Sequence, residues 1–131
     1  MEGSGRERGG GGRDGPFDHE RLDAYQTALQ FLEWRTGILK RLPSKHFLVD
    51  QLDRASTSIA FNIAEGSGEK PGAERCRIYR ISRRSATECS AILDIIEARK
   101  LEPKSRMAEG RQLIRRLIAM LTVLSRTNRP D

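Results

Sequence analysis

The side chains best suited to chemistry are scattered along the chain. His19 and His46 stand alone near the expected starts of helices, as surface or packing histidines usually do. Cys76 and Cys89 are expected on one helix, about 20 Å apart at 1.5 Å per residue, which is too far for a disulfide within the chain. Neither cysteine has a CxxC partner or an adjacent histidine. These four residues therefore predict no nucleophile, general base or metal ligand set.

Two further groups resemble reactive motifs only in part. Asn62 and Glu65 can be interpreted as a catalytic pair, but a structural hydrogen bond where two helices meet fits them better. Glu65 is expected in the last turn of its helix, where the dipole disfavours an anion, so we expect an arginine or a helix N-terminus to compensate it. The segment 66–72 resembles a phosphate-binding loop, yet it lacks the Walker spacing and a preceding strand.

These observations predict that the protein is not an enzyme and binds no cofactor and no metal. A catalytic site needs a convergent acid, base or nucleophile, and the sequence offers no such set. It contains neither an HExxH pair nor the Glu-x-x-His arrangement of di-metal bundles. No small-molecule substrate is expected either.

The most pronounced chemical feature is a cluster of arginines between residues 75 and 84. Its members are Arg75, Arg77, Arg80, Arg83 and Arg84. Arg80 and Arg84 lie one helical turn apart and repel each other, which favours a surface that meets phosphates or the acidic face of a partner. A solvated outer face explains the same pattern. Tyr79 is the sole aromatic residue nearby, so base stacking is not expected here.

Composition and length limit the possible classes of protein. The 131 residues suit one domain, and a formal charge of +6 with a pI near 9.9 favours anionic partners such as nucleic acid. No run of eighteen apolar residues is present, so no membrane span is expected. The start of the chain lacks the apolar core of a signal peptide, which favours the cytoplasm.

Apolar periodicity and the positions of proline and glycine predict four helices. We expect them at about residues 19–41, 45–66, 71–100 and 103–127. Asp18 and Ser44 are candidate N-caps for the first two, and Gly66 and Gly68 suit the left-handed positions that end a helix. The short connections predict an all-α, antiparallel up-down-up-down four-helix bundle over residues 17–131. Residues 1–16 are rich in glycine and predict a disordered tail.

The first two helices carry more apolar surface than one bundle core needs. In the first helix the expected core residues are Leu22, Tyr25, Leu29, Leu32 and Leu39. A second apolar group lies well round from them, and a matching group lies opposite the core stripe of the second helix. The two groups are Phe31, Trp34 and Ile38 in the first helix and Ala60, Phe61 and Ala64 in the second. A monomer would leave them in water, so we expect them to form an oligomer interface.

One stretch of the sequence carries a resemblance to a known family. Residues 58–68 read Ser-Ile-x-x-Asn-Ile-Ala-Glu-Gly-x-Gly, which resembles the hallmark of the four-helix-bundle proteins first noticed as open reading frames in bacterial 23S rRNA intervening sequences. The motif residues are Ser58, Asn62, Glu65, Gly66 and Gly68. The similarity extends over about residues 17–129. Two positions depart from it: Ala60 stands where many members have proline, and Arg84 where many have glycine.

The resemblance implies a homopentameric ring of four-helix subunits. A relative within the family, the accessory protein of diversity-generating retroelements, is similar in fold, forms a basic pentamer and works with a reverse transcriptase on RNA and DNA. We therefore expect a self-associating scaffold whose basic surface binds RNA or DNA without sequence specificity. A reverse transcriptase or another protein is a further possible partner. The alternative is an adaptor whose arginine face binds an acidic partner protein without nucleic acid, and the cellular role stays open.

Overall fold

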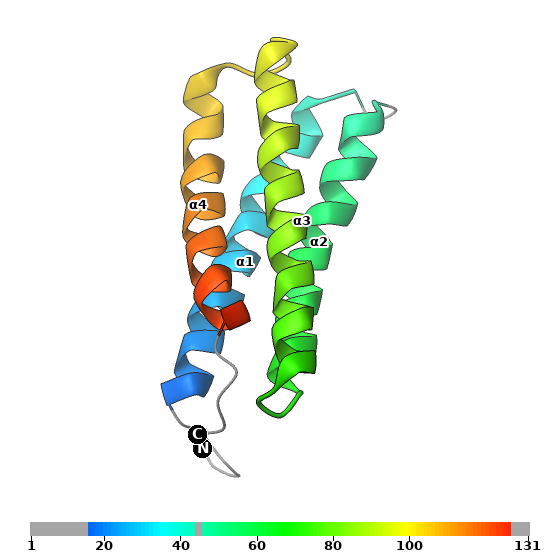
Figure 1. Ribbon diagram of the computed structural model, residues 1–131. Coiled ribbons are helices and arrows are strands. Elements are labelled where there is room, and N and C mark those ends of the chain that lie inside the picture. Colours follow the sequence, from blue (N-terminus) through cyan, green and yellow to red (C-terminus); the bar gives the residue numbers. More distant parts are fainter. Residues whose placement is uncertain (1–15, 44–45, 127–131) are drawn as a thin grey trace, which may run out of the picture.

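Four antiparallel helices form the structure, a computed structural model that describes residues 16–43 and 46–126, with side chains from residue 23 onward. The helices are α1 (Pro16–Arg41), α2 (Phe47–Ser67), α3 (Ala73–Ala98) and α4 (Lys104–Arg126). They run up, down, up and down, and α4 returns beside α1 (Figure 1). The described part contains no strand, and the predicted all-α four-helix bundle is confirmed. The expected tail lies outside the described residues, except that Pro16 already belongs to α1.

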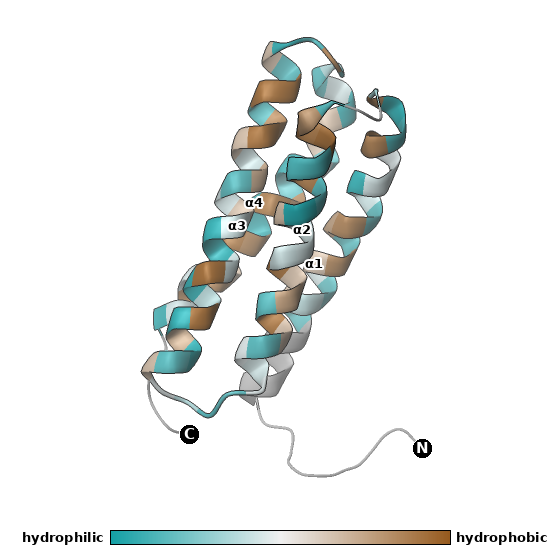
Figure 2. Ribbon diagram, turned by 90° about the vertical axis from the view of Figure 1, so that its right-hand side faces the viewer, coloured by the Kyte–Doolittle hydropathy of each residue, from teal (hydrophilic) through white to brown (hydrophobic). Residues whose placement is uncertain are grey.

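Each helix has an apolar side and a polar side, as the alternating brown and teal along the ribbons in Figure 2 shows. The expected core stripe of α2 is buried, with Leu48, Leu52 and Ile59 among its members. The stripes of α3 and α4 also face inward, where Cys89, Ile92, Ile96, Leu117 and Leu121 join one core cluster. Burial of these side chains is the main stabilising term for helices of this length, since isolated helices are marginal in water.

In α1 both apolar groups contact the core, since the predicted core residues Tyr25, Leu32 and Leu39 are partly buried against it, as Trp34 is. Phe31 and Ile38 are buried in the core, whereas Leu29 is 37% exposed and Leu32 is only partly buried. Both faces are apolar, and the one with the larger aromatic side chains turned inward. Phe31 stacks on Trp34 with 5.5 Å between ring centroids, so the two rings fill the space between α1 and α4 together.

Gly110 explains why Trp34 can pack in this direction. A Cβ atom at Gly110 would overlap the indole ring of Trp34, so the absence of a side chain lets α4 approach α1 closely. Trp34 is therefore a packing residue of the bundle and not part of an oligomer interface. The same correction applies to Phe31, Ile38 and Ala60, all of which are buried within one chain.

The helix ends differ from the predicted ones in three places. Asp18 lies inside α1, which begins at Pro16. His46 caps α2, since its Nδ1 accepts a hydrogen bond from the Leu48 N–H at 3.2 Å, while Ser44 lies outside the described residues. Gly68 has φ −85° and ψ −9°, a right-handed conformation, so the expected left-handed end of this helix is wrong.

Gly66 has a packing role and not a conformational one. It lies within α2, and a Cβ atom there would come 2.6 Å from Cε1 of Tyr79 on α3. The glycine of the motif therefore lets α3 lie close against the end of α2. The left-handed region is used elsewhere, at Gly72 before α3 (φ 153°) and at Lys100 after it (φ 57°).

Candidate nucleic-acid interface

The structure divides the five predicted arginines into three kinds. Arg75 is 2% exposed and lies one turn before the buried Tyr79, so both side chains point into the bundle. The prediction that Arg75 meets nucleic acid is wrong, because a buried side chain cannot reach a phosphate. The sequence could not show this, since a helical wheel places Arg75 by angle alone and not by how closely α2 and α3 approach.

Arg77 is exposed but already paired. Its Nε and Nη2 atoms donate to the two carboxylate oxygens of Glu74 at 2.9 and 2.7 Å. This bidentate pair lowers the pKa of Glu74 and raises that of Arg77. A phosphate must compete with a neighbouring carboxylate for this guanidinium, so Arg77 contributes less to an anion-binding surface than its charge suggests.

The other three arginines form no ion pair within the part of the chain that the structure describes. They are Arg80, Arg83 and Arg84, and we call them the α3 arginines. Arg80 and Arg84 are exposed one turn apart, and Arg83 is half-buried beside them. Like charges this close repel unless an anion lies between them. The α3 arginines are therefore the available part of the predicted basic surface.

Two arginines of α4, Arg111 and Arg116, are engaged elsewhere, whereas Arg115 is exposed and forms no ion pair within the described residues. Arg111 binds Asp94 at 2.8 Å and Glu97 at 2.6 Å, and these two carboxylates raise its pKa. Arg116 instead points toward α1, where Nη2 lies 3.4 Å from the hydroxyl of Thr27. Arg111 thus ties α4 to α3 and Arg116 lies near α1.

The motif residues form a polar contact between α2 and α3. The Asn62 Nδ2 donates to the carbonyl oxygen of Ser58 at 2.9 Å and to its hydroxyl at 3.0 Å. That hydroxyl lies 2.8 Å from the hydroxyl of Ser85 on α3, and Ser82 donates to the Ile59 carbonyl, also at 2.8 Å. Asn62 therefore has the structural hydrogen-bonding role that the sequence favoured over a catalytic one.

Glu65 has no such role. It is exposed, and its side chain makes no ion pair or hydrogen bond within the described residues. The expected compensation by an arginine or a helix N-terminus is not found there. Water can solvate an exposed carboxylate, which removes the need for a partner.

Two groups of ionic contacts, centred on Arg35 and on Glu102, join parts of the chain that periodicity alone does not bring together. Arg35 on α1 donates to the Ser56 hydroxyl at 3.0 Å and binds Asp53 at 2.9 Å, both on α2. Arg41 and Arg106 both bind Glu102, at 3.1 and 3.2 Å. Such pairs depend on which helices are neighbours and in what register, and neither follows from periodicity along one helix.

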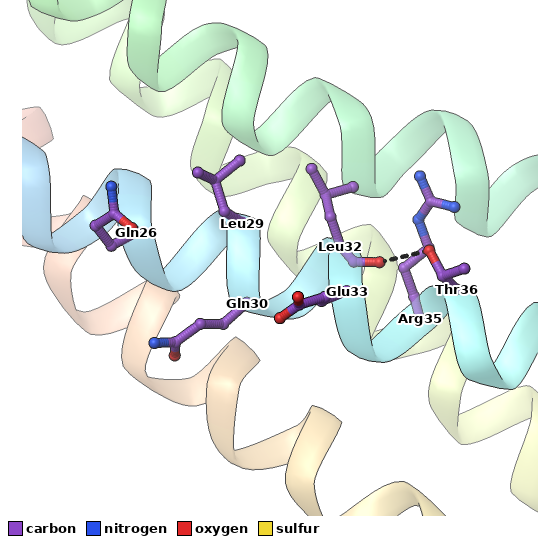
Figure 3. A pocket seen from close by; sticks show the side chains of 7 residues that line it. All are labelled: Gln26, Leu29, Gln30, Leu32, Glu33, Arg35 and Thr36. Atoms are coloured by element: carbon purple, nitrogen blue, oxygen red, sulfur yellow. Dashed lines mark hydrogen bonds between the residues drawn. The ribbon is translucent and has the colours of Figure 1, made fainter.

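The side chains that line a shallow hollow on α1 do not form a catalytic set. Seven residues of α1 line it: Gln26, Leu29, Gln30, Leu32, Glu33, Arg35 and Thr36. Figure 3 shows Leu29 and Leu32 directed toward α2, while Gln30 and Glu33 point the other way. The Thr36 hydroxyl is engaged with the Leu32 carbonyl at 2.9 Å. No other helix contributes a side chain, so the hollow is an open surface feature.

An exposed apolar face remains where α1 and α2 meet. Phe61 is 64% exposed and Ala64 is exposed, so this α2 part of the predicted interface does lie on the surface. On α1 the exposed apolar group is not the predicted one. We define the α1–α2 apolar face by Tyr25, Leu29, Leu32, Phe61 and Ala64.

The Cys89 thiol is expected to be inert in the folded protein. Burial, with a smaller contribution from the Glu88 charge, raises its pKa to about 12, so the reactive thiolate is scarce at neutral pH. In a Cys76→Ala variant, Ellman's reagent at pH 8 should leave Cys89 unmodified until urea unfolds the chain. Prompt labelling of the native variant, at the rate of the unfolded one, would contradict this. The buried thiol's contribution to stability should be complete below the pKa of an ordinary thiol and fall as the pH rises toward 12.

Two other kinds of site, a metal centre and a membrane-spanning helix, are absent from the described residues. Among the described side chains, those of residues 23–43 and 46–126, no three His, Cys, Asp or Glu gather as they would around a metal ion. None of the described helices is long and apolar enough to cross a membrane.

The fold and its polar α2–α3 contact define a small antiparallel helical-bundle protein. Residues 20–123 match the profile of the 23S rRNA-intervening sequence protein, and the chain belongs to that family. A similar solved structure, from Bacteroides thetaiotaomicron, is a protein with unknown function from the S23 ribosomal protein family. It is 18% identical, covers 79% of this chain and 99% of its own, and superposes with a TM-score of 0.73, which shows the shared fold. No curated protein matches the sequence significantly.

Proposed function

We propose that this protein is a non-enzymatic scaffold that self-associates and binds RNA or DNA without sequence specificity. The proposal rests on the α3 arginines, which form no ion pair within the described residues. Neighbouring arginines such as Arg77 and Arg111 are held by carboxylates. Arginines that face solvent together suit phosphate oxygens, which guanidinium groups bind by charge and geometry.

The α1–α2 apolar face supports self-association. Phe61 and Leu29 are large apolar side chains that one chain leaves in water. Single exposed apolar residues are ordinary, but a group of them across two helices suits contact with a second copy. The resemblance to basic pentameric relatives makes five copies the expected number. Repeating the α3 arginines around a ring would strengthen a weak contact through multivalency.

The test removes the arginines and measures binding as a function of salt. A variant with Arg80→Gln, Arg83→Gln and Arg84→Gln should bind a mixed-sequence RNA at least about tenfold more weakly, because each lost phosphate contact weakens binding and flattens its salt dependence. The matched control, Arg115→Gln with Arg116→Gln and Arg126→Gln, removes the same charge from exposed arginines of α4 that form no ion pair within the described residues, and it should retain more affinity. Fluorescence anisotropy at several salt concentrations measures both.

Two outcomes would contradict the proposal. Wild-type protein that binds neither RNA nor DNA at low salt would exclude nucleic acid as the ligand and favour the acidic-partner alternative. Affinity that does not change with salt would exclude phosphate contacts as its source. For self-association, light scattering on a sizing column should give about 74 kDa, five times the 14.8 kDa chain mass.

A further inference from the structure

The two ends of the bundle differ in charge. At one end α1 leads into α2 and α3 leads into α4, and we call it the loop end (top of Figure 1). Residues 40–43, 46–47 and 97–106 at this end carry six cationic side chains and two carboxylates. The cations are Lys40, Arg41, Arg99, Lys100, Lys104 and Arg106. At the opposite end, residues 64–78 carry three charges of each sign. The described part of the loop end therefore carries an excess of positive charge.

Glu97 and Glu102 are turned inward, whereas Asp50, in the first turn of α2 and three residues after Phe47, is exposed. Glu102 is 7% exposed and lies between Arg41 and Arg106, which bind it at 3.1 and 3.2 Å. Glu97 is bound by Arg111 of α4 at 2.6 Å. The outer surface is left with four cations that form no ion pair within the described residues, namely Lys40, Arg99, Lys100 and Lys104. Such a surface attracts a polyanion.

An exposed aromatic ring lies among these cations. Phe47 is the first residue of α2 and is 55% exposed. The ring of His46 is stacked on it with 5.2 Å between centroids, and the Arg99 guanidinium lies 5.6 Å from its centroid. Arg99 is itself exposed, and a cation–π contact is weak at an exposed site. A nucleobase can replace the guanidinium against the ring and leave Arg99 free to bind a phosphate.

We propose that the loop end binds single-stranded nucleic acid. Phe47 stacks against one unpaired base, and Lys40, Lys100 and Lys104 contact the phosphates on either side. Aromatic side chains beside a cationic surface are the usual means of holding a single strand, because every base has a face for stacking. In a duplex the bases are already stacked on one another, so Phe47 adds nothing to its binding. The inference rests on nucleic acid being the ligand, but it uses a surface remote from the α3 arginines.

Lys100 gives a variant that removes charge and preserves the backbone. Its φ of 57° lies in the left-handed region that glycine adopts freely, so Lys100→Gly relieves strain as it removes a cation. The loop-end variant is Lys40→Gln with Lys100→Gly and Lys104→Gln. The variant with Arg80, Arg83 and Arg84 replaced by glutamine is its matched control, since it loses the same formal charge from a different surface.

Fluorescence anisotropy tests the inference with two labelled ligands. One is oligo(dT) of about twenty nucleotides, which is longer than a typical single-strand site, and the other is a duplex of equal length. Phe47→Ala should weaken oligo(dT) binding by roughly tenfold and leave duplex binding unchanged. Val123→Ala, which removes an exposed apolar side chain on α4 outside the α1–α2 apolar face, should weaken neither. The loop-end variant should bind oligo(dT) more weakly, and the slope of log affinity against log salt concentration should fall by about two, since each of the three lost phosphate contacts contributes about 0.7.

The outcomes separate this inference from the proposed function. If Phe47→Ala and the loop-end variant both bind oligo(dT) like the wild type, while loss of the α3 arginines abolishes binding, the loop-end site is wrong and the proposed function stands. If the wild type binds duplex as tightly as oligo(dT) and Phe47→Ala changes neither, the preference for single strands is wrong. If the wild type binds no nucleic acid, both proposals are wrong.

Discussion

Replacing Phe31 by alanine is expected to lower the free energy of unfolding by about 3–5 kcal/mol, the usual loss for a fully buried aromatic side chain. Phe31 is 0% exposed and stacks on Trp34, so its removal leaves a cavity between α1 and α4. Urea denaturation followed by circular dichroism measures the change. Since the stability of an oligomer depends on subunit concentration, the titration should be repeated at two protein concentrations.

Phe61 provides the matched comparison. It is also a phenylalanine, but it is 64% exposed, and Phe61→Ala should change the unfolding free energy of the single chain by no more than about 0.5 kcal/mol. Phe61→Asp should instead lower the native mass on a sizing column, because it places a charge in the α1–α2 apolar face. If Phe31→Ala proved harmless and Phe61→Ala unfolded the chain, the observed orientation of α1 and α2 would be wrong.

Replacing Gly110 by alanine is expected to cost about 1–3 kcal/mol of stability, as overpacking of a well-filled core usually does. The added methyl group would overlap the indole of Trp34, so α4 must move away from α1 or Trp34 must turn outward. Thermal unfolding measures the loss, and Trp34 fluorescence should shift to the red if the ring becomes more exposed. The chain contains one tryptophan, which makes this signal specific.

Gly37→Ala is the control for this experiment. Gly37 is an exposed residue of the same helix as Trp34, and no atom lies within 4 Å of the place where its Cβ would be. Alanine favours the helix by about 1 kcal/mol over glycine, so this variant should be as stable as the wild type or more so. Equal stability of the Gly110→Ala and Gly37→Ala variants would show that Trp34 does not pack on α4 in this way.

The fold was predictable because it depends on short-range patterns. In α2, α3 and α4 one side of the helix is clearly more apolar, and Ile59, Cys89 and Leu117 on those sides are buried. The α1 helix has two apolar sides, and periodicity cannot choose between them. Gly110, some seventy residues away in sequence, decides between them. Because it has no side chain, the indole of Trp34 can lie this close to α4.

The candidate site was only partly predictable, for a related reason. The α3 arginines were identified by composition, but their availability depends on where carboxylates lie in three dimensions. Glu74 occupies Arg77 within one helix, which the i, i+3 spacing could have shown. Arg75 lies inside the bundle one turn before Tyr79, which packs on Gly66, and the loop end is formed by two connections more than fifty residues apart. Neither follows from one helix considered alone.

The serine contacts between α2 and α3 limit how these helices can slide. Apolar side chains in adjacent helices can shift by one turn and still bury similar areas, so a core of leucine, isoleucine and alanine leaves several alignments close in energy. Directional bonds do not allow this, because a shift of one turn separates Ser58 from Ser85 and leaves the Ile59 carbonyl without the Ser82 hydroxyl. A buried polar group that loses its partner costs about 1–3 kcal/mol. The short motif thus sets a single alignment of the two helices, and with it the spacing of whatever surfaces they carry.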